Sequence, residues 1–289
     1  MSDRGWRTII IDSEAKLSYQ NGSLSFQGSE EKSIPLEESS NLIITAPQVS
    51  LTAPLIVHLS RQNIQVLFCN EKKEPACQLT PIHGGCQSAG IVMHQAGWSA
   101  TKKDAAWQGI VEAKIRNQKN LLSALNLPVP PEMDTYICSI KSGDADNREG
   151  LAARVYFSAL FGPGFLRHSC DDTNAALDYG YAILKSAMCR ILAIHGYHPA
   201  LGIHHRSKVN PFNLACDLME PFRPYVDEMV YHSQGEFLDW EMKKKLIALL
   251  QAQVHWNGQL LKLQNAMEQY ALHIFRQIDA AIPIEGGGS

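Results

Sequence analysis

Residues 202–227 read GIHHRSKVNPFNLACDLMEPFRPYVD, and this stretch decides how the rest of the chain is interpreted. Two adjacent histidines, His204 and His205, precede two carboxylates, Asp217 and Glu220, that are three residues apart. On a helix this spacing places both carboxylates on one face. One imidazole with one or two carboxylates suits a hard divalent cation such as Mg²⁺ or Mn²⁺. Because isolated residues of these types more often lie at the surface or cap helices, local spacing alone leaves both interpretations open.

The same stretch predicts a short helix with defined ends. Asn210 can accept a hydrogen bond as the N-cap residue, and Pro211 suits the first helical position, where the backbone needs no N–H donor. Pro221 and Pro224 restrict the residues before them and interrupt a helical backbone. Glu220 is therefore expected near the C-terminal end of this helix.

A second informative stretch lies upstream, where residues 144–162 read DADNREGLAARVYFSALFG. On a helical projection its apolar residues form one face, and Glu149 falls inside that apolar arc. A carboxylate that faces inward is costly unless a cation or a hydrogen-bond donor meets it. Two plainer interpretations also stand, in which Glu149 complements the helix dipole or pairs with Arg148 or another arginine.

Residues 107–125 form an amphipathic helical pattern that passes close to a lysine. Its apolar stripe consists of Trp107, Val111, Ile115, Gln118, Leu122 and Leu125. Lys114 lies beside this stripe, and a lysine can bury its aliphatic stem while its ammonium group reaches solvent. We interpret Lys114 as a packing residue rather than a catalytic one.

Composition bounds the class of protein. The chain has 289 residues and is 45% hydrophobic, which supports a substantial core. Its seven cysteines are odd in number and include no C-x-x-C pair, so they indicate neither a disulfide framework nor a thiolate zinc site. The N-terminus MSDRGWRTIIID has no apolar signal core, and no run approaches the length that spans a bilayer. We expect a cytoplasmic protein with no membrane partner.

The formal net charge of −3, from 26 basic and 29 acidic residues, does not indicate a nucleic-acid partner. It does not exclude one, because a local basic groove can bind DNA on an otherwise acidic protein. The chain also has no G-x-G-x-x-G, Walker loop or G-x-S-x-G motif. These absences argue against the common dinucleotide oxidoreductases, P-loop ATPases and serine hydrolases.

The hydrophobic periodicity predicts an α+β fold, with a β-rich N-terminal domain followed by a larger all-α C-terminal domain. Residues 7–69 favour strands, Asn21-Gly22 favours a two-residue hairpin turn, and residues 54–62 read as a short helix. We place the domains at residues 1–80 and 98–285, with a Gly- and Pro-rich linker at residues 81–97.

The last part of the helical domain reads as one long helix over residues 236–278. Its run Lys243, Lys244 and Lys245 is typical of a solvated helix face. The ending EGGGS, residues 285–289, resembles a linker remnant and is left out of the fold interpretation.

Four stretches together resemble one known family. They are AKIRNQ at residues 113–118, REGLAARVYFSALFG at 148–162, NAALDYGYAIL at 174–184, and LGIHH followed by NPFNLACDLMEPFRPYVD at 201–227. The set resembles the CRISPR-associated integrase of the spacer-acquisition module, CRISPR-associated protein one, and its type II branch in particular. The resemblance covers nearly the whole chain.

The resemblance implies a β domain that forms a homodimer and a helical domain with one Mg²⁺ or Mn²⁺ site per subunit. The family's metal-binding and catalytic residues fall on Glu149, His205 and Glu220, with Asp217 beside the site. His204 is a neighbour without an assigned role. One departure is Asp178, where the family usually has asparagine; it lies away from the metal residues in sequence.

The resemblance also implies an activity and partners: 3′-hydroxyl ends of short DNA fragments are joined to a repeat array, together with CRISPR-associated protein two. Arg206, Lys208 and Arg223 are candidate phosphate contacts. Two alternatives remain open, a metal-dependent nuclease that uses water in place of the 3′-hydroxyl, and a DNA-binding scaffold with a degenerate site. The sequence does not separate transfer from hydrolysis, because both use the same metal and phosphate geometry.

Overall fold

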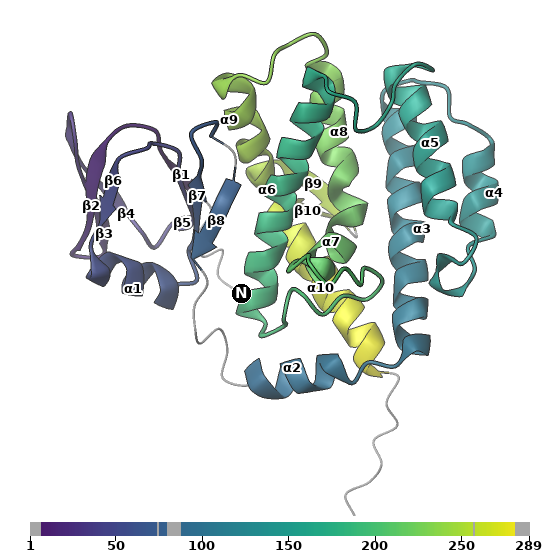
Figure 1. The fold of residues 1–289 in the computed structure, drawn as a ribbon, viewed down its shortest axis with the longest axis horizontal. Helices are drawn as coiled ribbons and strands as arrows, with labels where there is room; N and C mark the ends of the chain where they lie inside the picture. Colours follow the sequence, from purple (N-terminus) through teal and green to yellow (C-terminus); the bar gives the residue numbers. More distant parts are fainter. Residues whose placement is uncertain (1–6, 74, 80–87, 257, 281–289) are drawn as a thin grey trace, which may run out of the picture.

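The computed structural model describes residues 7–73, 75–79, 88–256 and 258–280. A strand-rich N-terminal part lies beside a larger helical part (Figure 1), as the sequence predicts. No helix among these residues is both long enough and apolar enough to cross a membrane. Residues 81–87 of the predicted linker and the EGGGS ending lie outside the described residues.

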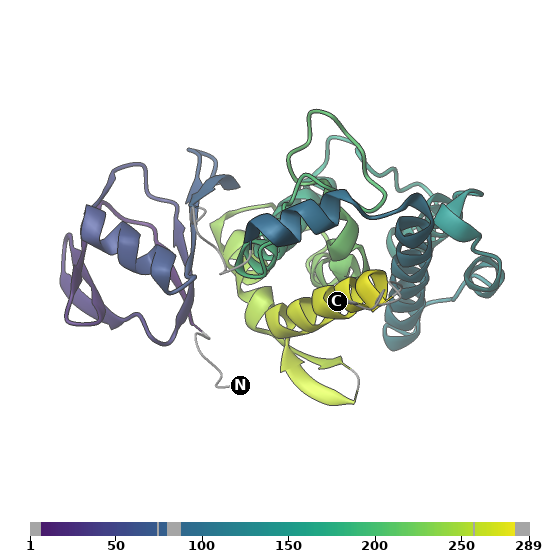
Figure 2. The same cartoon turned by 90° about the horizontal axis from the view of Figure 1, so that it is seen from below.

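The N-terminal part contains two four-stranded sheets and one helix. Its strands are β1 (Arg7–Ile11), β2 (Ala15–Gln20), β3 (Ser23–Gln27), β4 (Glu31–Pro35), β5 (Ser39–Ile44), β6 (Val49–Leu51), β7 (Gln65–Cys69) and β8 (Pro75–Leu79). One sheet has the order β1-β5-β7-β8 and the other β4-β3-β2-β6. The helix α1 (Ala53–Arg61) lies across one end of the space between the sheets (Figure 2), and Leu55 and Leu59 on it are fully buried there.

The predicted hairpin turn is present between β2 and β3. Gln20 pairs with Ser23, and the two residues between them, Asn21 and Gly22, have φ values of 47° and 81°. Both central residues of a type I′ turn need positive φ, which asparagine and glycine tolerate best. The Asn-Gly pair therefore fixes the register of these two strands.

Strand β5 is buried along its whole length because both faces of its sheet are covered. Leu42 and Ile44 pack between the two sheets, whereas Ile43 packs into the core of the helical part together with Leu67 of β7. Polar contacts reinforce this junction: Gln65 Nε2 donates to Ser186 Oγ at 2.5 Å. The β-rich part is thus attached to the helical part by a packed interface.

The helical part is built from eleven helical segments and one hairpin within the described residues. They are α2 (Ser88–Ala96), α3 (Ala100–Ala124), α4 (Glu132–Cys138), η1 (Ser142–Asp144), α5 (Arg148–Phe161), α6 (Asp172–Ile194), α7 (Asn213–Met219), η2 (Glu220–Phe222), α8 (Arg223–His232), α9 (Trp240–Ala248), η3 (Leu249–Gln251), β9 (Gln253–Trp256), β10 (Gln259–Lys262) and α10 (Leu263–Ala280), counting η3 with α9, which it continues.

Helix α6 is the centre of the helical part, and most of its residues are buried. It contacts α7, α8, α9 and α10 on the helical side and β7 and β8 on the other. Asp171 caps its N-terminus by accepting the N–H of Asn174 at 2.7 Å, and Gly196 follows its C-terminus with a φ of 77°. Both ends therefore carry residues that are typical of helix caps.

Two predictions for the helical part are wrong in detail. Residues 88–96, placed in the linker, form the helix α2. The single helix predicted for residues 236–278 is divided into α9 and α10 by the antiparallel hairpin of β9 and β10. Gly258 in this hairpin has a φ of 76°, which a helix does not accommodate. The helical pattern of the residues on either side gives no sign of this break in the sequence.

Lys243 also differs from its prediction as part of a solvated face. Its side chain is buried, its ammonium donates to the carbonyl of Lys72, and it lies 5.4 Å from the Tyr179 ring centroid. Lys244 and Lys245 pair with Glu241 and Glu236 on the surface. Lys243 thus belongs to the junction between the two parts.

A buried carboxylate joins three helices behind the site described below. Asp227 of α8 accepts hydrogen bonds from Tyr156 of α5 at 2.8 Å and from Tyr181 of α6 at 2.5 Å. Burial raises the pKa of Asp227 to about 6, although the two tyrosine hydrogen bonds and the charge of Arg223 oppose the shift.

Because this pKa lies above the ordinary value of 3.8, Asp227 contributes stability that is present below pH 3.8 and lost as the pH rises through about 6. The shift corresponds to about 3 kcal/mol. We expect denaturant unfolding between pH 4 and pH 6.5 to show this decline in wild type and to lose it in Asp227→Asn. Parallel pH profiles for the two proteins would contradict this assignment.

Candidate active site

Glu149 is held at the first turn of α5 by two polar residues that precede the helix. Asp144 accepts the backbone N–H of Arg148 at 2.7 Å and that of Glu149 at 3.0 Å. Asn147 is the N-cap residue, with a φ of 52°, and accepts the N–H of Gly150 at 3.2 Å. These contacts satisfy free N–H groups of the first turn and so fix the start of α5, from which the Glu149 side chain projects.

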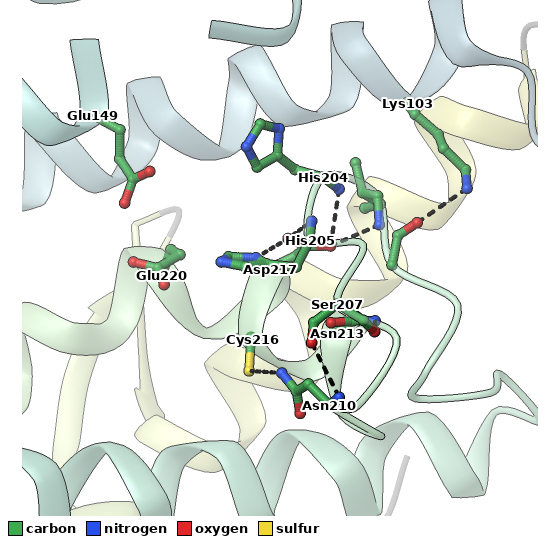
Figure 3. Close-up of polar contacts among 12 residues, drawn as sticks. Lys103, Glu149, His204, His205, Ser207, Asn210, Asn213, Cys216, Asp217 and Glu220 are labelled. Atoms are coloured by element: carbon green, nitrogen blue, oxygen red, sulfur yellow. Dashed lines mark hydrogen bonds and ion pairs between the residues drawn. The ribbon is translucent and has the colours of Figure 1, made fainter. Parts of the chain in front are cut away.

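His205 is oriented by Asp217, which is fully buried. One oxygen of Asp217 accepts the N–H groups of Ile203 and His204, at 2.6 and 3.1 Å. The other accepts the N–H of His205 at 3.1 Å and faces its ring Nδ1 at 2.6 Å (Figure 3). The hydrogen bond that the Asp217 carboxylate accepts from the ring raises the pKa of His205. With Nδ1 directed at Asp217, the ring presents Nε2 on its other side.

The loop that carries His205 depends on Gly202. A Cβ atom on Gly202 would lie 2.3 Å from the carbonyl oxygen of His205 and 2.9 Å from the Cβ of Asn213. Such contacts do not occur in folded proteins without a backbone shift. The close approach that the glycine permits lets the backbone of residues 203–205 turn its N–H groups toward Asp217.

Glu220 follows α7 directly, near its C-terminal end as predicted, and begins η2. The predicted start of this helix is wrong by two residues. The helix begins at Asn213, and Asn210 instead accepts the N–H of Phe212 at 3.0 Å in a turn before it. Asp217 and Glu220 do not share a partner, because Asp217 faces His205 whereas Glu220 faces α3 and α8.

Two cations hold Glu220, whose side chain is 2% exposed. Lys114 Nζ lies 2.5 Å from Glu220 Oε2, and Arg223 Nη2 lies 2.6 Å from Glu220 Oε1. Arg223 also stacks over the Tyr181 ring at 4.6 Å. Arg223 is one of the predicted phosphate contacts, but in this structure its guanidinium binds Glu220 and Tyr181 within the protein.

Lys114 is the residue that the sequence interpretation underestimated. It does not extend its ammonium group to solvent but is 5% exposed, with Nζ 2.5 Å from Glu149 Oε1 as well as from Glu220. Burial lowers its pKa, but the two glutamates more than offset this effect and the pKa is raised. For Glu149 the balance is opposite: burial raises its pKa, but Lys114 more than compensates and the pKa is lowered.

The side chains of the three predicted metal ligands border one region of the folded protein. Figure 3 shows the carboxylates of Glu149 and Glu220 and the ring of His205 directed toward one region between α5 and η2. Carboxylate oxygens with a single imidazole are a donor set that fits Mg²⁺ or Mn²⁺. In the present arrangement the described residues contain no group of three or more His, Cys, Asp or Glu side chains placed to hold a metal ion, and the Lys114 ammonium lies between the two glutamates.

His204 points away from this region (Figure 3). Its ring stacks on Trp107 of α3, with ring centroids 4.3 Å apart and planes within 7°. Its backbone N–H is one of the donors to Asp217. We therefore interpret His204 as a residue that attaches the loop to α3, a role that the adjacent pair of histidines does not reveal in sequence.

Arg206 and Lys208 are exposed on the loop that follows His205, and neither forms an ion pair with another described residue. Val209 next to them is 92% exposed. Asp178 lies on the surface of α6, where it pairs with Arg167 at 2.5 Å. The departure at Asp178 thus affects a surface ion pair and not the candidate site.

Comparisons with known proteins identify the family of this chain. A sequence model of the family described as CRISPR associated protein Cas1 matches residues 8–236. The CRISPR-associated endonuclease Cas1 of Neisseria meningitidis is 38% identical over 256 residues, which cover 86% of this chain and 84% of that protein.

Two solved structures show the same fold at low identity. A casposase bound to its integration product has a TM-score of 0.76 and 17% identity, covering 98% of this chain and 96% of that one. A chain of a Cas6-RT-Cas1–Cas2 complex has a TM-score of 0.69 and 16% identity, covering 97% of this chain and 35% of that one. The family match and the Neisseria relative confirm the predicted family: this chain belongs to the Cas1 family of CRISPR-associated proteins.

Proposed function

We propose that this protein is a metal-dependent DNA integrase, which joins the 3′-hydroxyl ends of short DNA fragments to a CRISPR repeat array. The observation that carries the proposal is the convergence of Glu149, Glu220 and the Nε2 side of His205, each held by its own hydrogen bond or ion pair. Membership in the Cas1 family supports it, as does the structural likeness to a casposase whose title names an integration product.

The proposed chemistry is attack of a 3′-hydroxyl on a DNA phosphodiester, a transition state that concentrates negative charge on phosphoryl oxygens. When bound, Mg²⁺ or Mn²⁺ neutralises that charge and lowers the pKa of the attacking hydroxyl. Glu149 and Glu220 supply anionic oxygens, and His205 supplies a neutral nitrogen. Asp217 keeps His205 in the tautomer with its proton on Nδ1, which leaves Nε2 free to act as a ligand.

A second function, hydrolysis of DNA at the same site, is favoured by the name of the Neisseria relative, an endonuclease. Water would then replace the 3′-hydroxyl as nucleophile. A non-catalytic DNA scaffold is disfavoured, because a degenerate site would not retain Glu149, Glu220 and His205. It would also not retain the buried Asp217, which orients the His205 ring.

The test is to supply labelled DNA fragments with a free or a chemically blocked 3′ end, together with a repeat-containing target and Mg²⁺ or Mn²⁺. Integration predicts joined products only from fragments with a free 3′ end. Cleavage that is equal for both fragments, without joining, would replace the integrase proposal with the nuclease. If neither joined nor cleaved DNA forms with Mg²⁺ or Mn²⁺, only the non-catalytic DNA scaffold remains.

The proposed assembly contains DNA, a second copy of this chain and CRISPR-associated protein two, a partner suggested by the Cas1–Cas2 complex among the similar structures. The β-rich part, residues 7–79, carries none of the proposed catalytic residues, and we assign dimerisation to it. We expect light scattering at micromolar concentration to give the mass of a dimer. A mass of one chain across that range would contradict the two-site arrangement.

Arg206 and Lys208 are proposed to contact the DNA backbone, because they are exposed beside His205 and form no ion pair with the described residues. Neutralising both should reduce the slope of log affinity against log salt by about two units, since each phosphate contact releases about one counterion. All DNA sequences should weaken alike. The control is neutralisation of Lys16 and Lys32, exposed lysines of the β-rich part. An unchanged slope for the Arg206 and Lys208 variant would place the backbone contacts elsewhere.

A further inference from the structure

The space between the two glutamates of the site is already occupied by a positive charge. Lys114 extends from α3, reaches Glu149 of α5 and Glu220 of η2 at 2.5 Å each, and is 5% exposed. The second oxygen of Glu220 is taken by Arg223 at 2.6 Å. Among the four carboxylate oxygens, only Oε2 of Glu149 lacks a cation partner within the part of the chain that the structure describes.

The charges of this cluster balance without a metal ion. Two cations, Lys114 and Arg223, face two carboxylates, Glu149 and Glu220, in a largely buried site. A divalent cation added to the same oxygens would place a charge of +2 beside the Lys114 ammonium, where little water screens the repulsion. Lys114 and a divalent cation therefore compete for the same oxygens.

We propose that Lys114 is an internal competitor of the divalent cation, holding Glu149 and Glu220 together in the metal-free protein and leaving them when the cation binds. This inference rests on the proposed metal site. A lysine suits the role because its ammonium is a point charge on a flexible four-carbon stem, which can withdraw along α3. The consequence is a metal affinity lower than the ligands alone would give, together with a stable metal-free fold.

The test compares Mn²⁺ binding and thermal melts for wild type and variants, with free Mn²⁺ measured by electron paramagnetic resonance. Lys114→Met keeps the length and apolar stem of the side chain but removes the charge. Without metal its melting temperature should fall by roughly 5–15 °C, because two buried carboxylates lose a partner. Its affinity for Mn²⁺ should rise about tenfold or more, and Mn²⁺ should raise its melting temperature more than that of wild type.

Matched controls separate this effect from general damage to the helix. Lys119→Met changes a lysine of the same helix that pairs with Asp134 near the surface, and it should leave Mn²⁺ affinity unchanged. His205→Ala should lose Mn²⁺ binding if the ion occupies the proposed site. If Lys114→Met does not fold without metal, Lys114→Gln, which keeps a hydrogen-bond donor, carries the same comparison.

The outcomes distinguish this inference from the proposed function. Unchanged or weaker Mn²⁺ binding by the Lys114 variants, beside normal binding by wild type, would overturn the competition and make Lys114 a support of the metal site. Absence of Mn²⁺ binding in wild type would remove both the metal site and its competitor. Tighter binding by both Lys114 variants, with Lys119→Met unchanged, is the expected result.

Discussion

Replacing Glu149 with glutamine is expected to lower metal-dependent strand transfer on the order of a thousandfold, because one anionic ligand of the proposed cation is lost. Glutamine has nearly the same volume and can still accept the hydrogen bond that Lys114 now donates to Glu149. The caps from Asp144 and Asn147 use backbone groups and are unaffected. The variant should therefore keep its fold while losing activity.

The measurement is joining of labelled fragments in Mg²⁺ or Mn²⁺, beside a thermal melt of each variant. His205→Ala and Glu220→Gln should show comparable losses of activity. Glu220→Gln should also lose stability, because Lys114 and Arg223 would face a neutral group in a buried position. Glu112→Gln is a suitable control, since Glu112 pairs with Arg116 on the exposed face of α3. Full joining activity in Glu149→Gln would refute the metal site.

The sequence predicts much of the fold because local signals are strong there. Asn21-Gly22 specifies a turn that only residues tolerant of positive φ can form, and Asp171 with Gly196 marks both ends of α6. The sequence does not reveal the hairpin of β9 and β10, because each strand has only four residues and is flanked by helices. Four residues are too few for alternation to stand out against a helical pattern.

The candidate site was predicted less completely, because its decisive contacts join distant residues. The three ligands were identified through a family resemblance and not through spacing. Lys114 lies 35 residues from Glu149 and 106 from Glu220, so its position beside an apolar stripe could show that it is buried but not what meets it. Glu149 gave the complementary indication, because a carboxylate within an apolar arc needs a cation as its partner.

Asp217 is the residue for which the structure most changes the expected result. The family resemblance places Asp217 beside the metal site without making it a ligand. In the structure it is fully buried and serves four donors, the N–H groups of three successive residues and the Nδ1 side of His205. We therefore expect Asp217→Ala to be among the most harmful single changes in the chain.

The cost has two components that can be measured separately. Removing the carboxylate leaves buried donors unsatisfied at about 1–3 kcal/mol each, so Asp217→Ala should lower the free energy of unfolding by several kcal/mol even without metal. Asp217→Asn keeps the volume, but its amide has one acceptor oxygen where the carboxylate has two, so either the His205 ring or the N–H groups of Ile203 and His204 would face an NH2 donor. We expect it to fold and to lose on the order of a hundredfold in metal affinity and strand transfer.

Asp178→Asn is the matched control, because it removes an exposed carboxylate that pairs with Arg167 and lies outside the site. Surface ion pairs contribute about 0–1 kcal/mol, so this variant should melt and join DNA like wild type. If Asp217→Asn joined DNA as well as Asp178→Asn does, His205 would not need a fixed tautomer to act. The loop of residues 203–205 would then position the imidazole through its backbone alone, and the role of Asp217 would be limited to stability.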